Sequence, residues 1–336
     1  MNRILLIIVA LVACSELSPR AMAQSMTSIR SERARTVAGL TIKGEFAAAL
    51  DSCHAIVREE PANPVGYFLL ATAYYTINNQ FRNDHYADSV STAVDTAIAL
   101  ARKRTEDSRN SAEWHFVLGS SFGCRALYRS LHGGWWGAFR DGHNGCVNLE
   151  KAYDKDTSFT DALSGVGAYH FWKSAKAKIL TFLPFVSDKR DEGIAELRRA
   201  VAAHGTMSVN AQRSLLPIYY EQKQYDAAVA LADSLATEHL LDPNSRLHLA
   251  RSLIALKQWD QAMQALDQVL SEWKNSPYYD SCAEPEVLYL KATIYKGRGE
   301  SAEAQKCLDQ IFAAKAACDN NQYYQQSLSS ANDLAH

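Results

Sequence analysis

The sequence predicts an all-α protein, a right-handed α-solenoid of about seven helical hairpins with insertions. Three observations predict this class. The chain has 8 prolines and 16 glycines in 336 residues, too few for a β-sandwich with a turn about every ten residues. Its apolar residues recur three and four positions apart, which is the spacing of one helix face. One pattern also occurs twice at an offset of 34, in residues 224–236 and 258–270.

The composition is that of a soluble globular protein, with 47% hydrophobic residues, 21% charged residues and a formal net charge of −2. Lysine and arginine residues are dispersed and do not form a basic stripe interleaved with aromatic residues. Nucleic acid is therefore not an expected partner. No pattern in the chain calls for a cofactor.

Residues 1–23 have the pattern of a secretory signal peptide. Arg3 supplies an early cation, an apolar run extends from Ile4 to Ala13, and Ala21-Met22-Ala23 form a small-x-small cleavage site before Gln24. The apolar run is too short to span a bilayer as a mature helix. This pattern predicts export, to the periplasm or out of the cell.

A second interpretation of the same segment is a lipoprotein signal. Leu11-Val12-Ala13-Cys14 resembles the bacterial lipobox, in which residues 1–13 are removed and Cys14 is lipidated. An outer-membrane lipoprotein is then expected, whose membrane contact is its lipid anchor. Both interpretations place the protein outside the cytoplasm.

Two segments carry the repeat in register: QYDAAVALADSLA at 224–236 and QWDQAMQALDQVL at 258–270. Tyr225 aligns with Trp259, and Ala228 aligns with Ala262. The pattern resembles the second helix of the tetratricopeptide repeat, which has an aromatic residue first and a small residue three positions later. The resemblance implies a solenoid over residues 27–317, in which stacked hairpins bury one another's apolar stripes and the surface serves binding rather than catalysis.

The other predicted helices follow in order along the chain. Second-helix patterns occur at 46–61 and 301–312, and first-helix patterns at 67–74, 115–122, 163–170 and 287–295. Small residues are expected where paired helices come closest, because a larger side chain there would force the hairpin apart. They are Gly119, Gly167, Ala228, Ala262 and Ala304. Residues 318–336 are polar and are predicted to form a short capping helix with a frayed end.

The segment RSLHGGWWGAFRDGHNGC, residues 129–146, predicts a turn at Gly133-Gly134 and a helix that begins near Trp135. The glycines permit close helix contact, and both tryptophans are expected to pack between helices. A metal site is the alternative, because this segment contains candidate ligands. They are His132, Asp141, His143 and Cys146. Their spacing matches no established zinc pattern, so no metal is expected.

An enzyme is the alternative from a different functional class. Residues 119–123 match G-x-S-x-G, the nucleophile elbow of hydrolases, which requires a sharp strand-to-helix turn. Here the motif lies in the middle of a predicted helix, so the sequence favours a protein without catalytic activity. A hydrolase or metalloenzyme would have to bring several side chains into one cleft. They are His115, Ser121, His132, His143 and His170.

The concave face of a tetratricopeptide solenoid is lined by recurring first-helix positions, and projecting these positions gives the candidate binding residues. They are Phe68, Tyr75, Phe116, Phe171, Trp172, Arg213, Tyr220 and Arg251. Such an aromatic and cationic groove suits a peptide, a protein segment or an apolar small molecule. The alternative is that the aromatic residues pack against the long inserts. A role as an accessory of a periplasmic transporter or envelope-assembly complex is a further possibility within binding functions.

The insert at 173–190 contains an apolar run, Ile179 to Val186, that is interrupted by Pro184 and too short to cross a membrane. A helix is predicted after it, because Asp188 to Glu192 form an N-terminal cap pattern. This insert either fills the groove or presents an exposed patch to a partner or a bilayer surface.

An even number of cysteines remains after loss or lipidation of Cys14, which permits disulfides in an exported chain. Cys282 precedes the first helix of the last hairpin and Cys318 follows the second, so antiparallel packing predicts that they pair. Cys124 and Cys146 lie in facing helices of one hairpin and are the second candidate pair.

Overall fold

The computed structural model describes residues 27–107, 111–177 and 188–335, and the regular structure in them is entirely helical. The helices follow one another as seven consecutive pairs: α2 (Glu32–Lys43) and α3 (Phe46–Glu59), α4 (Pro64–Phe81) and α5 (Ala87–Asp107), α6 (Ala112–Leu131) and α7 (Trp135–Lys155), α8 (Ala162–Ala177) and α9 (Arg190–Ala202), α10 (Ser208–Glu221) and α11 (Tyr225–Thr237), α12 (Pro243–Ala255) and α13 (Trp259–Lys274), α14 (Glu284–Arg298) and α15 (Ser301–Ala313). A 3-10 turn η3 (Ser281–Ala283) precedes α14, and α16 (Lys315–Cys318) and α17 (Gln322–Ala335) follow α15. The predicted all-α solenoid of helical hairpins is confirmed.

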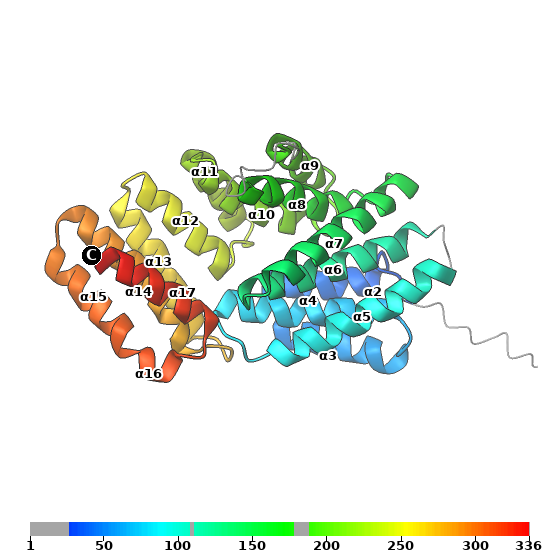
Figure 1. The fold of residues 1–336 in the computed structure, drawn as a ribbon, viewed down its shortest axis with the longest axis horizontal. Helices are drawn as coiled ribbons and strands as arrows, with labels where there is room; N and C mark the ends of the chain where they lie inside the picture. The colour runs from blue at the N-terminus through cyan, green and yellow to red at the C-terminus, as the bar shows by residue number, and fades with distance from the viewer. Residues whose placement is uncertain (1–26, 108–110, 178–187, 336) are drawn as a thin grey trace, which may run out of the picture.

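The pairs stack side by side along the chain (Figure 1). Helices α2–α7 lie at one end of the molecule, α8–α11 follow, and α12–α17 form the other end, with α17 against α14 and α15. None of the described helices is long and apolar enough to cross a membrane. The predicted leader at 1–23 with Cys14, and the apolar run Ile179–Val186, lie outside the described residues.

Side-chain caps mark where several helices begin. Ser31, Asn63 and Asp242 each accept a hydrogen bond from a backbone N–H in the first turn of α2, α4 and α12. A proline follows Asn63 and Asp242 directly, at a position where a missing N–H costs nothing. Gly44 and Gly299 end α2 and α14 with left-handed φ angles of 79° and 80°.

Two glycine pairs set the closest helix contacts. A Cβ atom on Gly119 of α6 would lie 2.9 Å from the carbonyl oxygen of Gly145 of α7. A Cβ atom on Gly167 of α8 would lie 2.5 Å from the carbonyl oxygen of Gly193 of α9. In each pair the backbones of the two helices therefore touch at a position where only glycine fits, as predicted for Gly119 and Gly167. The three predicted small positions in later repeats, Ala228, Ala262 and Ala304, are also buried.

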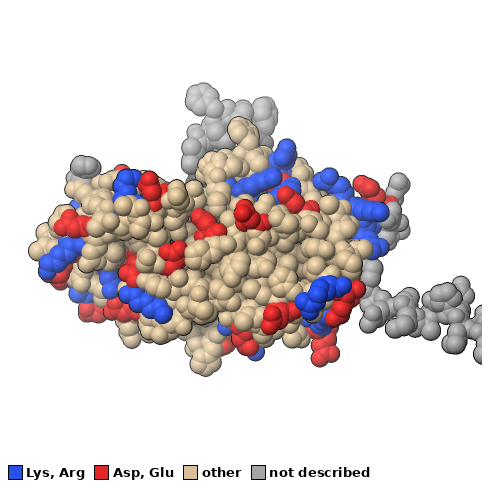
Figure 2. All heavy atoms as spheres, turned by 90° about the horizontal axis from the view of Figure 1, so that it is seen from below, with Lys and Arg blue, Asp and Glu red and all other residues tan. Residues whose placement is uncertain are grey.

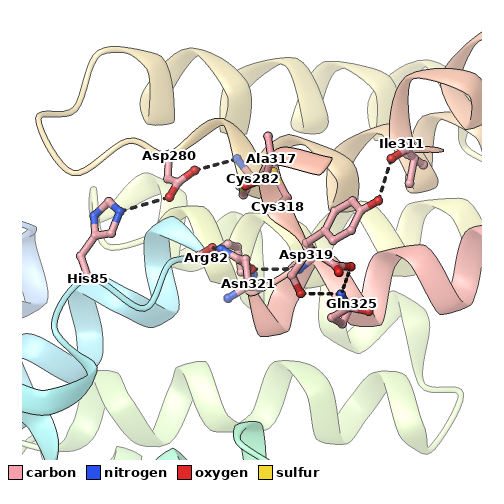
Figure 3. Close-up of a disulfide and its surroundings, with 11 residues drawn as sticks. Arg82, His85, Asp280, Cys282, Ile311, Ala317, Cys318, Asp319, Asn321 and Gln325 are labelled. Atoms are coloured by element: carbon pink, nitrogen blue, oxygen red, sulfur yellow. Dashed lines mark hydrogen bonds and ion pairs between the residues drawn. A yellow bond between two sulfur atoms is a disulfide. The ribbon is translucent and has the colours of Figure 1, made fainter. Parts of the chain in front are cut away.

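The end of α4 reaches across the molecule to the last hairpins. The buried indole of Trp273 donates its Nε1–H to the backbone oxygen of Gln80 over 2.7 Å. Asn321 donates an amide N–H to the backbone oxygen of Arg82 over 2.9 Å, which places the start of α17 beside the end of α4 (Figures 1 and 3). A single apolar core joins Phe46 and Phe81 to residues of α10–α14. The solenoid therefore closes on itself, which the repeat pattern does not predict.

Cys282 and Cys318 form a disulfide with an S–S distance of 2.02 Å and a Cα–Cα distance of 5.4 Å, as the sequence predicts (Figure 3). The bond connects η3 to α16, on either side of the last hairpin. The second candidate pair, Cys124 and Cys146, is wrong, because both are free thiols. The Cys124 thiol interacts with Tyr75 of α4, whereas the Cys146 sulfur lies 3.9 Å from His170 Nε2 of α8. The two side chains therefore face different neighbouring helices.

Gly167→Ala is expected to lower the free energy of unfolding by about 1–3 kcal/mol, because the added methyl group forces α8 away from α9. The control is Gly39→Ala, where a Cβ atom meets nothing within 4 Å in the middle of α2. That change is expected to stabilise the helix slightly, by up to about 1 kcal/mol. Urea unfolding of both variants measures the difference, and equal midpoints would contradict the close contact.

Candidate functional site

The most exposed large apolar side chains in the described residues gather at the tip of the α6–α7 hairpin. Leu127, Trp135, Trp136 and Phe139 are 53%, 63%, 88% and 54% exposed. We call these four residues the hairpin-tip patch. The prediction that both tryptophans pack between helices is therefore wrong.

The reason lies in the buried face of α7. Buried residues at 138, 141, 145, 149 and 152 recur three and four positions apart, and three of them are alanine or glycine. Ala138 and Gly145 belong to this buried face of α7. Trp136 and Phe139 lie outside it, on the side of the helix that faces solvent. Gly133, with a φ of 75°, makes the tight turn that starts α7 at Trp135.

Ion pairs hold the hairpin tip in place. The fully buried Asp141 carboxylate accepts hydrogen bonds from Arg125 over 2.8 and 2.9 Å and from Arg129 over 2.5 Å. His132 lies 3.2 Å from Asp84, and the hydrogen bond to that carboxylate raises the pKa of His132. Asp141 therefore pairs with two arginines of α6 rather than joining His132 at a metal. Arg140 is exposed beside the patch and has no ion-pair partner among residues 27–107, 111–177 and 188–335.

Three of the predicted groove residues lie in the core. Phe68 and Phe116 are 6% and 4% exposed, and Phe171 is fully buried. The Phe116 ring packs against Phe159, at a ring-centroid distance of 5.5 Å. The prediction that these three aromatic rings line an open groove is wrong, because adjacent helices and connections cover the first-helix positions.

The other predicted positions lie nearer the surface, but most are engaged within the chain. Trp172 is half-buried beside Phe171, and Tyr220 is exposed beside Tyr225, with ring centroids 5.5 Å apart. Arg213 pairs with Asp242 over 3.0 Å and donates to backbone oxygens of Ile42 and Leu240. Tyr75 and Arg251 belong to a charged centre described next.

The charged centre joins α4, α12 and α14. The Glu286 carboxylate accepts from Arg82 and from Arg251, each over 2.5 Å. Burial opposes ionisation of Glu286, but the two guanidinium groups outweigh it and lower its pKa to about 2. His248 lies beside both arginines, and burial together with their charge lowers its pKa to about 3. Burial also raises the pKa of Tyr75.

A polar pocket of about 610 Å³ lies where the α2–α3 turn meets α10–α13. Arg213 and Asp242 line it, as do Arg246 and Glu272, which pair over 2.8 Å. The charges in this pocket are therefore largely paired, and its lining differs from the aromatic groove that was predicted. On the face drawn in Figure 2, acidic and basic side chains are likewise interspersed.

The alternative catalytic set is dispersed. His115 contacts Asn148 over 3.1 Å, and the buried Ser121 hydroxyl donates to the backbone oxygen of Val117 over 2.7 Å. His143 is exposed on α7. Ser121 is buried in the middle of α6, whereas a nucleophile elbow requires an exposed serine on a sharp strand-to-helix turn, so the nucleophile-elbow hypothesis is wrong.

His170 lies beside a thiol and two carboxylates. Its Nδ1 lies 2.8 Å from Glu196 of α9, and its Nε2 faces Cys146 and Glu150 of α7. Burial raises the pKa of Cys146 to about 12, so this thiol is not an activated nucleophile. The short-spacing patterns considered for the sequence miss this cluster, because its members lie on three helices.

Comparison with known proteins identifies the repeat. Residues 219–282 match the family described as tetratricopeptide repeat. This matched segment runs from the end of α10 to η3 and includes both copies of the pattern that recurs at an offset of 34. No curated protein sequence matches it significantly.

Solved structures with a similar arrangement of helices include a tetratricopeptide repeat protein from Parabacteroides merdae, at 15% identity, covering 89% of this chain and 97% of that chain with a TM-score of 0.43. Yeast Tom70 is similar at 10% identity, with 90% and 88% of the two chains covered and a TM-score of 0.39. The human IFIT1 dimer with PPP-AAAA is similar at 15% identity, with 81% and 69% covered and a TM-score of 0.42.

The charged centre predicts a pH dependence of stability. Folded His248 stays neutral down to a pKa of about 3, whereas an unfolded histidine takes up a proton near pH 6.5. Stability from this residue is therefore complete above pH 6.5 and falls as the pH drops towards 3, by at most about 1.4 kcal/mol per pH unit. His248→Gln is expected to remove this slope between pH 6 and pH 4.5 in urea unfolding. Unfolding at pH 8 checks that the variant folds, and an unchanged slope would contradict the assignment.

Proposed function

We propose that this tetratricopeptide repeat protein is a non-enzymatic scaffold that binds a partner protein segment at the hairpin-tip patch. Stacked helical hairpins provide extended interaction surfaces, which supports the general role. The observation that carries the specific proposal is the exposure of Trp135 and Trp136, at 63% and 88%, beside Leu127 and Phe139.

The chemistry of the patch favours a protein ligand. Contiguous exposed apolar side chains mark interaction sites, and tryptophan is among the residues that contribute most to binding energy at protein interfaces. The Asp141 ion pairs hold the hairpin before a partner arrives, so little ordering entropy is lost on binding. The exposed Arg140 side chain adds a positive charge at the edge of the hairpin-tip patch. The expected partner is therefore a segment with apolar side chains and a nearby carboxylate.

This site replaces the concave aromatic groove as the proposed location for a peptide or protein segment, because the phenylalanines projected to line that groove are buried. An apolar small molecule is the less favoured ligand, since the patch is an exposed surface rather than an enclosed cavity. An accessory role in a transporter or envelope-assembly complex would use the same surface.

We further propose that the protein is exported. The Cys282–Cys318 disulfide supports this proposal, because structural disulfides persist in oxidising compartments and are rare in the cytosol. The sequence pattern at 1–23, or the lipobox-like residues ending at Cys14, would provide the signal.

The partner proposal is tested by selecting peptides from a displayed random library on the wild-type protein. The double variant Trp135→Ser/Trp136→Ser is expected to bind the selected peptides at least about 30-fold more weakly, which corresponds to about 2 kcal/mol. Tyr220→Ser is the matched control, since Tyr220 is also exposed but lies on α10. Both variants are expected to unfold at the wild-type temperature.

Equal binding of the selected peptides to the wild type and to the tryptophan variant would overturn the assignment of the hairpin-tip patch as the binding site. So would tryptophan-dependent sedimentation with phospholipid vesicles in the absence of any selected peptide, because the patch would then be a membrane contact.

The export proposal is tested by expressing the full chain in a bacterial host and alkylating free thiols under denaturing, non-reducing conditions. Mass spectrometry is expected to show an N-terminus at Gln24 or an acylated Cys14, and a peptide cross-linked between Cys282 and Cys318. A retained leader together with alkylation of both cysteines would exclude export by this route.

A further inference from the structure

Cys146 and Glu150 of α7 converge on His170 of α8 in the middle of the molecule. The Cys146 sulfur lies 3.9 Å and a Glu150 carboxylate oxygen 3.6 Å from His170 Nε2. All three potential ligand atoms lie within 4.8 Å of one another. We propose that Cys146, Glu150 and His170 bind a zinc ion that ties α7 to α8.

The helical register explains the convergence. Cys146 and Glu150 are four residues apart, so both project from one face of α7. His170 lies on α8, which packs against α7 on one side and α9 on the other. Cys146 and His170 are 4% and 6% exposed, and Glu150 extends towards solvent with its side chain 44% exposed. The cluster is therefore protected but has an entry path at Glu150.

The distances fit a tetrahedral zinc ion. Zinc binds cysteine sulfur at about 2.3 Å and histidine nitrogen or carboxylate oxygen at about 2.0–2.2 Å. Tetrahedral angles then place sulfur and nitrogen about 3.6 Å apart, and nitrogen and oxygen about 3.4 Å apart. The corresponding distances of 3.9 and 3.6 Å exceed these values by only a few tenths of an ångström. The third distance, between the Cys146 sulfur and a Glu150 carboxylate oxygen, is also within 4.8 Å, so rotamer adjustments of the three side chains would complete the site.

The surroundings of His170 orient it for this role. Its Nδ1 lies 2.8 Å from the Glu196 carboxylate of α9, and Glu196 is 13% exposed. When Nδ1–H donates to Glu196, the lone pair of Nε2 points towards Cys146 and Glu150. A carboxylate behind the histidine is the usual outer partner of a zinc-ligating imidazole. Zinc also matches the charge of the site, because one thiolate and one carboxylate together neutralise a divalent cation.

Tyr169 provides a second, independent observation. Its hydroxyl is buried and has no hydrogen-bond partner in the described part of the chain. The Tyr169 ring lies 6.3 Å from the His170 ring between centroids, and its hydroxyl interacts electrostatically with Cys146 and Glu150. Buried polar atoms are almost always partnered, so an unpartnered hydroxyl points to a missing polar ligand. Three protein ligands leave a fourth zinc position, which a water molecule can occupy.

A competing set uses His170 with Glu192 and Glu196. Glu192 is half-exposed and already pairs with Lys189 over 3.2 Å, and this set contains no sulfur ligand. The buried set with Cys146 is therefore the better zinc site.

The test uses the full chain, freed of metal with a chelator, dialysed and titrated with Zn²⁺ and with Co²⁺. The wild type is expected to bind one ion per chain and to show thiolate-to-cobalt charge-transfer absorption in the near ultraviolet. Cys146→Ser is expected to lose that absorption and bind zinc much more weakly. Cys307→Ser is the matched control, because Cys307 is a buried free thiol on α15 outside the cluster.

Glu196→Gln keeps all three ligands and is expected to weaken zinc affinity about 10–100-fold by loosening the hold on His170. If Cys146→Ser does not fold, Glu150→Gln supplies the ligand deletion at a half-exposed position. Charge-transfer absorption that persists in Cys146→Ser, zinc affinity unchanged in Glu150→Gln, or no zinc binding by the wild type would overturn the proposal.

Discussion

The contact between the end of α4 and the last two hairpins organises the rest of the structure. Arg82 is almost fully buried there and pairs with Glu286, while Arg251 binds the same carboxylate from the other side. A buried carboxylate between two guanidinium groups is stable only if all three partners are present, because any one left alone would be an unpaired charge in the interior. These ion pairs hold together residues more than two hundred positions apart. They also mean that Arg82 and Arg251 are paired with a carboxylate of the same chain.

This closure explains why the outer hairpin tip, rather than the inner face, carries the accessible apolar surface. The first-helix phenylalanines are buried in the core beneath neighbouring helices. Arg213 and Arg251 bind carboxylates and backbone carbonyls of the same chain. Near the α6–α7 tip, in contrast, Arg125 and Arg129 of α6 and the buried Asp141 of α7 occupy the contact between the two helices. The tryptophans are therefore displaced outward, onto a hairpin that Asp141 keeps rigid.

Local and periodic features could be predicted from the sequence, and long-range ones could not. The 34-residue pattern places the hairpins, glycine identifies the close contacts at positions 119 and 167, and the antiparallel ends of one hairpin bring Cys282 to Cys318. Exposure of Trp136 depends on whether a neighbouring helix covers it, which hydrophobicity alone does not report. The cluster of Cys146, Glu150 and His170 escapes pattern recognition because it combines side chains of α7 and α8, and no repeat relates Arg82 to Glu286.

The position of the disulfide has a consequence for how the chain assembles during synthesis. Asp280 contacts His85 and caps Cys282, and Asn321, three residues after Cys318, donates to Arg82 (Figure 3). The side chains that hydrogen-bond to the α4–α5 connection are therefore translated some two hundred residues after it. The Cys282–Cys318 disulfide holds the two segments that carry them together. Long-range contacts of this kind form late and slowly. The early hairpins therefore carry an arginine without its carboxylate partner until α14 has been translated, which couples completion of the first repeats to synthesis of the last.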